Sequence, residues 1–289
     1  MKKWLCLGIL VMSASFVFSQ SEYQASFYKL MQAGRIDDAK GMLADWERSN
    51  PNDIELAICN FNYYMYMGTV TENTIGKMPD GRYGAYPKTY VKEPQYSIAL
   101  GYLDKALAID ADRIDVHIGK MQYLDMNQKY SELESCIAAM LSRIDINANK
   151  WNFKNGKPLS EYGKNPEQVI INAINNVISV IRYNEDLFDI GYNISIVENK
   201  YFPNNVIAIN HLASYLLDKG EAQAGIDLLL KAYSIDPTDE VIIINIGLAY
   251  SKMNSIDEAI KYFSLIIDSK DKRKSDFARQ QIEKLQAKK

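Results

Sequence analysis

The chain of 289 residues is 47% hydrophobic and 24% charged, and its formal net charge of −3 leaves no basic excess to neutralise nucleic-acid phosphates. We therefore expect no nucleic-acid partner. Fifteen glycines and eight prolines are too few for a long low-complexity chain, so the composition indicates a folded protein of one large domain or two.

Residues 1–19 have the features of a secretory signal peptide. Lys2 and Lys3 precede an uncharged apolar run, Leu5–Phe18, and a small residue stands before the expected cleavage site at Gln20. The run is shorter than the ~20 residues that a bilayer-spanning helix needs. We therefore predict removal of this segment, export to the periplasm or beyond, and no transmembrane segment afterwards. An uncleaved anchor is the alternative.

The chain after Gln20 opens with two amphipathic helices joined by a turn at Gly34. Apolar side chains recur at the three- and four-residue spacing of a helix face on both sides of that turn. They are Tyr23, Phe27 and Leu30 before the turn, and Ala39, Leu43 and Trp46 after it. Because Pro51 disfavours continuation of the second run, the pattern predicts a helical hairpin that ends there.

A second unit begins in the same register but is interrupted. Its first helix is predicted from about Asp53 through Tyr66, and Gly68 falls thirty-four residues after Gly34. Its second helix is delayed by an insertion at about 69–94 and is marked by small and apolar residues. These residues are Ala99, Leu103 and Ala106.

Two insertions are rich in aromatic residues. The insertion at 69–94 holds the turn sequence Pro79-Asp80-Gly81 and several tyrosines, and a second insertion, at about 149–163, holds Trp151 and the turn pair Asn155-Gly156. Turn residues flanked by aromatic residues favour β-hairpins or ordered loops. We expect one or the other in both insertions.

A third helical hairpin is predicted between the insertions. Its helical faces consist of His117, Met121 and Leu124, followed by Leu133, Ile137 and Met140. Asp110, Asp112 and Asp115 lie just before or within its start, but they lack the ligand spacing and turn glycine of a calcium loop. These three aspartates are therefore predicted to mark the end of one helix and the start of the next.

The next unit starts with Asn165-Pro166-Glu167-Gln168, which combines a capping residue, a first-turn proline and a glutamine that can complete a capping box. Its first helix is predicted to run to about Arg182, with a partner helix over Glu185–Asn199. In the partner helix, Gly191 and Ser195 occupy positions where larger contacts are expected.

The clearest hairpins come last. The final one has Ile243, Ile246, Gly247 and Tyr250 in its first helix and Ala259, Phe263 and Ile266 in its second. Thirty-four residues earlier, the same positions hold Ile209, Leu212, Ala213 and Leu216, then Gly225, Leu229 and Ala232. A polar helix at about 276–287 is predicted to cap the stack.

These hairpins resemble the tetratricopeptide repeat, a helix-turn-helix unit of 34 residues. The resemblance depends on small residues at helix crossings (Ala213, Gly247 and Ala259), on Phe263 and on the closing Pro237, and it covers most of 20–289. It implies an all-α, right-handed α-solenoid of about six hairpins whose apolar faces are buried by stacking. It further implies a non-enzymatic scaffold with a concave groove lined mainly by first helices.

We find no residue set for catalysis, a cofactor or a metal. His117 and His211 fall on first helices, where a packing role is expected. Glycine-rich phosphate loops, paired-histidine zinc motifs and nucleophile elbows are absent from the sequence. We therefore predict no enzymatic activity. Cys59 and Cys136 could form a disulfide in an oxidising compartment or stay as buried thiols.

The leading hypothesis is that the groove binds a protein or peptide partner. In the repeat register, the groove residues include Tyr28, Asn62, Tyr66, Gln122, Asn176 and Asn210. Amide side chains can bond to an extended peptide backbone, and tyrosine adds apolar area with a polar tip. An ordinary polar surface is the alternative interpretation of these residues.

A second hypothesis assigns binding to the insertions. Tyr83, Tyr86, Tyr90 and Trp151 would form an aromatic platform for a glycan or small ligand. The alternative is that these aromatic residues close the end of the helical core. The sequence leaves the identity of the partner and the oligomeric state open.

Overall fold

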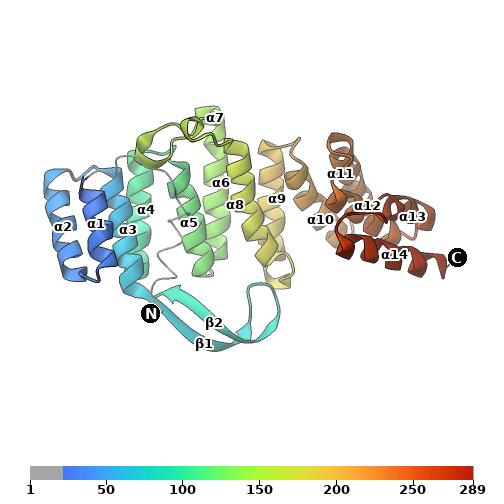
Figure 1. Ribbon diagram of the computed structural model, residues 1–289, viewed down its shortest axis with the longest axis horizontal. Coiled ribbons are helices and arrows are strands. Elements are labelled where there is room, and N and C mark those ends of the chain that lie inside the picture. Colours follow the sequence, from blue (N-terminus) through green and yellow to red (C-terminus); the bar gives the residue numbers. More distant parts are fainter. Residues whose placement is uncertain (1–21, 289) are drawn as a thin grey trace. The chain divides into compact units, whose positions relative to one another are not determined.

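The computed structural model describes residues 22–288, and the predicted signal peptide, residues 1–19, lies outside them. The described chain forms α-helices, labelled α1 to α14, and one two-stranded antiparallel sheet (Figure 1). It divides into two compact units, one up to Val180 and one from Ile181 onward. The predicted all-α class is confirmed, with a small sheet as an addition.

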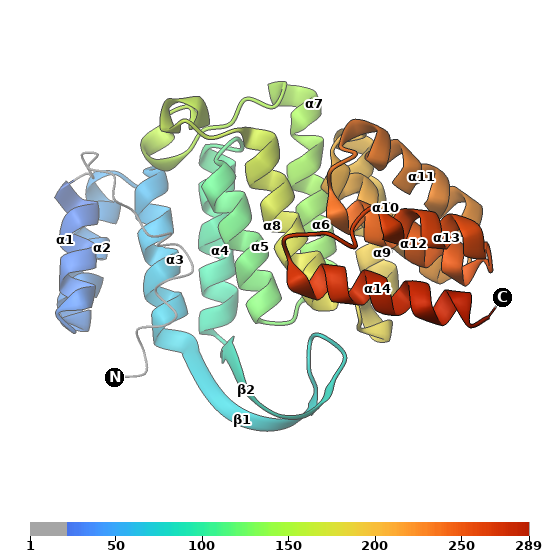
Figure 2. The ribbon, with the colours of Figure 1, turned by 45° about the vertical axis from the view of Figure 1, so that its right-hand side comes forward.

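The first unit is a stack of helical hairpins (Figures 1 and 2). Its helices are α1 (Glu22–Gln32), α2 (Ile36–Ser49), α3 (Ile54–Gly68), α4 (Gln95–Ile109), α5 (Ile114–Met126), α6 (Tyr130–Ser142), α7 (Ile144–Asn147) and α8 (Pro166–Ile181). The sheet consists of β1 (Thr69–Lys77) and β2 (Tyr83–Val91), which join α3 to α4. Each predicted helix up to α6 is therefore present.

The second unit repeats the same architecture. Its helices are α9 (Phe188–Tyr201), α10 (Val206–Lys219), α11 (Ala222–Ile235), α12 (Glu240–Lys252), α13 (Ile256–Ser264) and α14 (Lys272–Gln286). The pairs α10–α11 and α12–α13 are the two hairpins that the sequence pattern predicted most clearly. Asn205 and Asp239 cap the first helix of each pair by accepting backbone N–H groups at 3.0 and 2.8 Å.

Four of the hairpin turns share one backbone conformation. Gly34 and Gly220 adopt positive φ angles of 71° and 88° directly after a first helix, where glycine carries no steric penalty. Gln128 and Asn254 take the same conformation, with φ of 57° and 59°, at the equivalent positions of their hairpins. Gly34 and Gly220 therefore have the predicted role of turn glycines, whereas Gly68 is the last residue of α3 and leads into β1.

The helices cross closely where a side chain is missing. A Cβ atom added to Gly247 on α12 would lie 2.8 Å from the ring of Phe263 on α13. A Cβ atom on Gly225 would lie 2.7 Å from Leu217. These rings and branched chains fill the space left by glycine, so the apolar core of the second unit forms between the helices of each hairpin.

The small residues in α9 have a similar explanation. A Cβ atom on Gly191 would lie 1.9 Å from the hydroxyl oxygen of Tyr215 on α10, and Ser195 is fully buried. α9 therefore packs closely on α10 because a large aromatic side chain occupies the missing volume. The pattern at Gly191 and Ser195 reflects a bulky neighbour that the sequence did not identify.

The first insertion is a β-hairpin, one of the two predicted alternatives. Its strands pair in register from Thr69↔Val91 to Lys77↔Tyr83. The hairpin leaves the end of α3 where the other repeats turn into their second helix, and it extends past the helix ends (Figure 2). At its base the Val91 N–H donates to Asn127 Oδ1 at 2.8 Å, which fixes β2 to the end of α5.

The second insertion is an ordered loop with short 3₁₀ turns at Lys154–Gly156 and Leu159–Tyr162. The Ile114 N–H donates to the Asn152 carbonyl at 3.0 Å, and the Asn152 N–H donates to the Asp112 carbonyl at 2.9 Å. These bonds fix the loop to the N-terminal end of α5.

The C-terminal helix begins earlier than predicted. α14 starts at Lys272 instead of about Asp276, because the Asp271 side chain accepts the Arg273 N–H at 3.0 Å and caps the helix there. The predicted range left residues 272–275 outside the helix. The capping aspartate was the signal that it missed.

Replacing Phe263 by alanine should lower the free energy of unfolding by about 3–5 kcal/mol, because its ring is fully buried against Gly247. Leu265→Ala is the matched control, since Leu265 lies two residues away and is 53% exposed. We expect that control to change stability by less than about 0.5 kcal/mol. Urea unfolding followed by circular dichroism measures both variants, and equal losses would contradict the packing of α12 on α13.

Candidate functional site

Successive first helices place their polar side chains next to one another. In the first unit, Asn62 Nδ2 on α3 donates to the Tyr28 hydroxyl on α1 at 2.9 Å. Asn62 is buried, and burial raises the pKa of the Tyr28 hydroxyl well above its ordinary value. These two predicted groove residues therefore lie together, but they bind each other.

The other predicted groove residues of the first unit are more separate. Tyr66 is half-buried beside the core formed by α1, α2 and α3. Gln122 is half-buried on α5, and Asn176 is exposed on α8. The structure therefore leaves Asn176 as the most accessible amide among the predicted residues.

In the second unit, an amide pair lies beside exposed apolar side chains. Asn245 Nδ2 on α12 donates to Asn210 Oδ1 on α10 at 2.7 Å. Val241 and Leu248 lie four residues before and three residues after Asn245, so all three share one face of α12. Val241 is 47% exposed and Leu248 is 40% exposed. We call Val241, Asn245 and Leu248 the outer stripe of α12.

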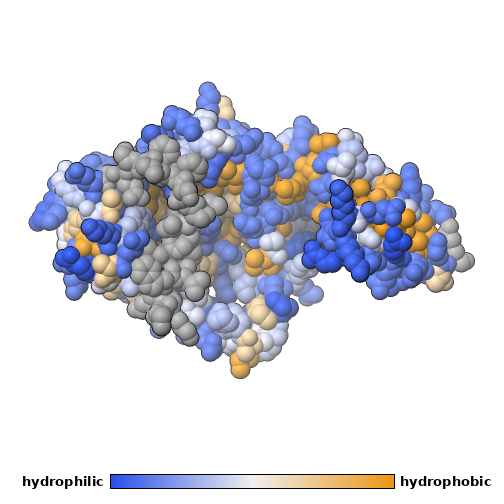
Figure 3. Space-filling view, viewed as in Figure 1, coloured by the Kyte–Doolittle hydropathy of each residue, from blue (hydrophilic) through white to orange (hydrophobic). Residues whose placement is uncertain are grey.

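The sequence identified Asn210 but missed the outer stripe. Asn245 follows Asn210 by thirty-five residues, so a strict shift of thirty-four aligns Asn210 with Ile244 instead. A search for polar residues one position from the strict repeat would have found it. Hydrophobic side chains are visible over the region of α12 and α13 in the space-filling view (Figure 3).

A buried ionic cluster joins the first helices of the first unit. Arg113 is fully buried and pairs with Glu55 at 2.9 Å and with Asp115 through two bonds of 2.8 Å. Gln24 donates to the other oxygen of Glu55 at 2.5 Å. The Asn155 N–H from the second insertion lies 3.3 Å from Glu55. Each charge therefore has partners, and the cluster fastens this insertion over the helix starts.

The structure corrects the predicted aromatic platform. Trp151 is only 2% exposed, packs edge-on against His117, and donates its indole N–H to Asn149 Oδ1 at 2.8 Å. It lies at the N-terminal end of α5, whereas the β-hairpin is attached at the C-terminal end of the same helix. Trp151 therefore closes the core and cannot form one surface with Tyr83, Tyr86 and Tyr90.

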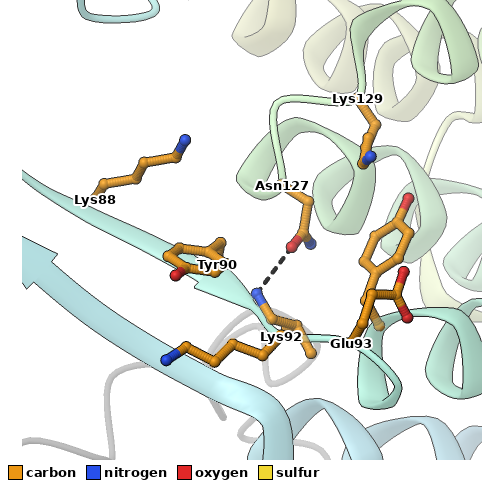
Figure 4. A pocket seen from close by; sticks show the side chains of 8 residues that line it. Lys88, Tyr90, Lys92, Glu93, Asn127 and Lys129 are labelled. Carbon is orange, nitrogen blue, oxygen red and sulfur yellow. Dashed lines mark hydrogen bonds between the residues drawn. The ribbon is translucent and has the colours of Figure 1, made fainter. Parts of the chain in front are cut away.

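The three hairpin tyrosines have different surroundings. Tyr83 is 76% exposed near the tip. Tyr86 donates its hydroxyl to the Lys77 carbonyl at 3.3 Å, across the hairpin. Tyr90 lines a cavity of about 490 Å³ at the hairpin base, together with residues from β2, α4 and the α5–α6 turn (Figure 4). Tyr86 and Tyr90 therefore line two different cavities, and Tyr83 lines neither of them.

A second cavity, of about 260 Å³, lies between β2 and the end of α5. It is lined by Tyr86 and Lys88 from the hairpin and by Asp125 from α5. Burial raises the pKa of the Asp125 carboxyl from its ordinary 3.8 to about 6. This carboxylate is therefore costly to keep charged at neutral pH.

The remaining candidates for chemistry have structural contacts. His117 Nε2 bonds with the Ala111 carbonyl at 2.9 Å, and burial lowers its pKa. His211 Nδ1 lies 2.7 Å from buried Glu198. Cys59 and Cys136 are buried free thiols, which decides between the two predicted alternatives.

The aspartates that precede α5 also accept hydrogen bonds from other side chains of the fold. Asp112 accepts bonds from Arg143 at 2.9 and 3.1 Å, and Asp110 accepts one from Asn152 at 2.9 Å. Within residues 22–288, His, Cys, Asp and Glu side chains form no group of three that could hold a metal ion.

Comparison with known proteins identifies the repeat. Residues 242–272, which span α12, α13 and the start of α14, match the family model of the tetratricopeptide repeat. The resemblance seen in the sequence is therefore confirmed, and α12–α13 is a tetratricopeptide hairpin. No curated protein matches the chain significantly.

Several solved structures resemble the chain at low sequence identity. YrrB, described as a tetratricopeptide protein with an unusual peptide-binding site, is 13% identical, with a TM-score of 0.44, and the match covers 82% of this chain and 97% of YrrB. PilF of Pseudomonas aeruginosa is 12% identical, with a TM-score of 0.41 and coverage of 92% and 96%. The pilus biogenesis factor PilW is 10% identical, with a TM-score of 0.42 and coverage of 88% and 96%.

Among the helices of the described chain, none is both long enough and apolar enough to cross a membrane.

Asp125→Asn should stabilise the protein at neutral pH. Because the folded-state pKa is raised, the folded state keeps its proton at pH values where the unfolded state has lost it, so stability falls as pH rises from about 4 to about 6. The substitution removes this loss and should raise the free energy of unfolding by about 1–2 kcal/mol at pH 7. This is less than the full pKa shift would give, because the residue is only half-buried.

Urea unfolding across pH 4–7 measures this effect. Asp37→Asn on the exposed side of α2 is the control, and its pH profile should parallel that of the unmodified chain. An unchanged slope between pH 4 and 6 in Asp125→Asn would show that Asp125 is not the titrating group.

Proposed function

We propose that this chain is a non-catalytic scaffold that binds an extended peptide segment of a partner protein on the first-helix faces of its repeats. The observation that supports this most directly is the outer stripe of α12. Exposed apolar side chains there flank an amide that already pairs with Asn210 of the preceding repeat.

The chemistry of this surface suits a peptide backbone. Each amide offers two donors and an acceptor with two lone pairs, so the bond between Asn210 and Asn245 leaves capacity for a further partner. Val241 and Leu248 offer apolar contacts on either side, at the spacing of successive turns of α12. A bound segment could therefore bond to the amides and bury an apolar side chain of its own.

The glycan or small-ligand alternative has weaker support. Its platform loses Trp151 to the core, and Tyr83 stands 76% exposed near the hairpin tip. No observation favours a sugar over other ligands at the hairpin.

Peptides selected from a displayed random library against the full chain should depend on this face. We expect Leu248→Ser, and separately the double substitution Asn210→Ala with Asn245→Ala, to weaken their binding about 5- to 30-fold, since each removes roughly 1–2 kcal/mol of contact. Isothermal titration calorimetry measures the affinities. Lys261→Ala on the exposed side of α13 is the matched control and should leave them unchanged.

A shortened hairpin separates the two hypotheses. Replacing Gly76–Gly84 with Asn-Gly keeps the Ile75↔Ala85 pair and closes it with a favourable two-residue turn. Peptide binding should survive this change if the first-helix faces are the site. If binding is lost when the hairpin is shortened and is unchanged by Leu248→Ser, the insertion would be the binding site instead.

We further propose that the protein works outside the cytoplasm, on the basis of Lys2, Lys3 and the apolar run Leu5–Phe18. N-terminal sequencing of protein from native cells should then start at Gln20. Leu10→Lys, which places a charge in the apolar run, should leave an uncleaved chain inside the cell. A chain that keeps its first nineteen residues in the unmodified protein would contradict export by this route.

A further inference from the structure

The cavity at the base of the β-hairpin has a cationic lining. Lys88, Lys92 and Lys129 contribute positive charge, while Glu93 is the one carboxylate among the lining residues. The chain as a whole is acidic, with a net charge of −3, so this excess is local. The volume of the cavity, about 490 Å³, falls within the range of about 300–1,000 Å³ that is usual for ligand sites.

Two of these ammonium groups are directed by aromatic rings. Lys88 Nζ lies 5.8 Å from the centre of the Tyr90 ring, and Lys129 Nζ lies 5.3 Å from that of Tyr96. Figure 4 shows the two lysine chains on opposite sides of the cavity, whereas the Lys92 chain runs away from it. The ring faces attract the cations without neutralising their charge.

These lysines differ from others on the surface. Lys105, Lys120 and Lys274, for example, form ion pairs with Glu47, Asp104 and Glu240. No ion pair involves Lys88 or Lys129 within the described part of the chain. Glu72 lies opposite Lys88 in the sheet but forms no ion pair with it, so an anion that enters the cavity can bind Lys88 or Lys129 without breaking an existing ion pair.

The other polar side chains of the cavity have partners within the fold, and one of them is the Tyr96 hydroxyl, which donates to Glu132 at 3.3 Å. Glu93 accepts bonds from the Ser97 hydroxyl at 2.9 Å and the Ser97 N–H at 3.3 Å, at the start of α4. Asn127 accepts from the Val91 N–H at 2.8 Å and donates to the Tyr123 carbonyl at 2.7 Å. The neighbouring carboxylate, Asp125, faces the second cavity. Lys88 and Lys129 are thus the groups left for a ligand.

We propose that Lys88, Tyr90, Tyr96 and Lys129 bind a carboxylate side chain of an acidic peptide segment. The two cations attract the carboxylate from opposite sides of the cavity, and the tyrosine rings contact the methylene groups and any apolar residue beside it. The cavity opens to solvent, so a longer chain can continue past it (Figure 4). Inorganic phosphate would use the cations but leave the ring faces without a partner.

This inference names the chemistry of one partner segment and in that sense depends on the proposed scaffold function. The site is separate from the outer stripe of α12, so Leu248→Ser should not affect it. Loss of one site with retention of the other would distinguish failure of this inference from failure of the proposed function.

The test uses the full chain and the blocked tripeptide acetyl-Glu-Phe-Glu-amide, with binding followed by chemical-shift changes at the Asn127 side-chain amide. We expect saturable binding that weakens with added salt. The peptide acetyl-Gln-Phe-Gln-amide should bind at least about tenfold more weakly, because it offers no charge to the two lysines.

Protein variants locate the effect. The double variant Lys88→Gln with Lys129→Gln should lose about tenfold in affinity for the acidic peptide. Lys29→Gln with Lys40→Gln removes the same charge from exposed positions on α1 and α2 and should bind as the unmodified chain does. Tyr90→Ala should also weaken binding, and circular dichroism verifies that each variant stays folded.

Three results would overturn the inference. Equal binding of the Glu and Gln peptides would exclude a carboxylate site. An equal loss of affinity in the Lys29 and Lys40 variant would show that binding depends only on the net charge of the protein. Inorganic phosphate that binds as tightly as the acidic peptide, with no effect of Tyr90→Ala, would assign the cavity to a free anion.

Discussion

The close crossing of two helices within a hairpin is the constraint on which this fold depends. At Gly247 the ring of Phe263 occupies the space that a Cβ atom would need, and at Gly225 the side chain of Leu217 does the same. Such contacts bury the apolar faces between paired helices, and the opposite side of α12 stays exposed at Val241 and Leu248. The outer stripe of α12 is uncovered for that reason, so the surface proposed for binding follows from the packing.

The repeat itself could be read from the sequence because its signals are local. Apolar spacing, the turn glycines Gly34 and Gly220 and the capping residues each act within a few positions, and helices formed where they predicted. The insertions could not be read in the same way. The contact of Val91 with Asn127 and the burial of Trp151 against His117 join distant residues. An aromatic residue in a loop looks the same in sequence whether it closes a core or faces solvent.

The sequence predicted which helices carry the candidate binding residues, but it did not predict which partners these residues bond to. Asn62 and Asn210 lie on first helices, as the register implied, yet each bonds to a side chain of the neighbouring repeat. Tyr28 and Asn62 are thirty-four residues apart, whereas Asn210 and Asn245 are thirty-five apart. The two separations differ by one residue, so a fixed period of thirty-four finds the first partner and misses the second.

The two cationic features of the first unit show how burial decides the role of a charge. Arg113 is removed from water, and a guanidinium in that position requires the carboxylates of Glu55 and Asp115 to offset its desolvation. Its charge is therefore paired within the fold and does not attract a ligand. Lys88 and Lys129 stay in contact with solvent at an open cavity, where ring faces suffice to orient them. A cation that does not need an internal carboxylate is the kind that can accept one from a partner.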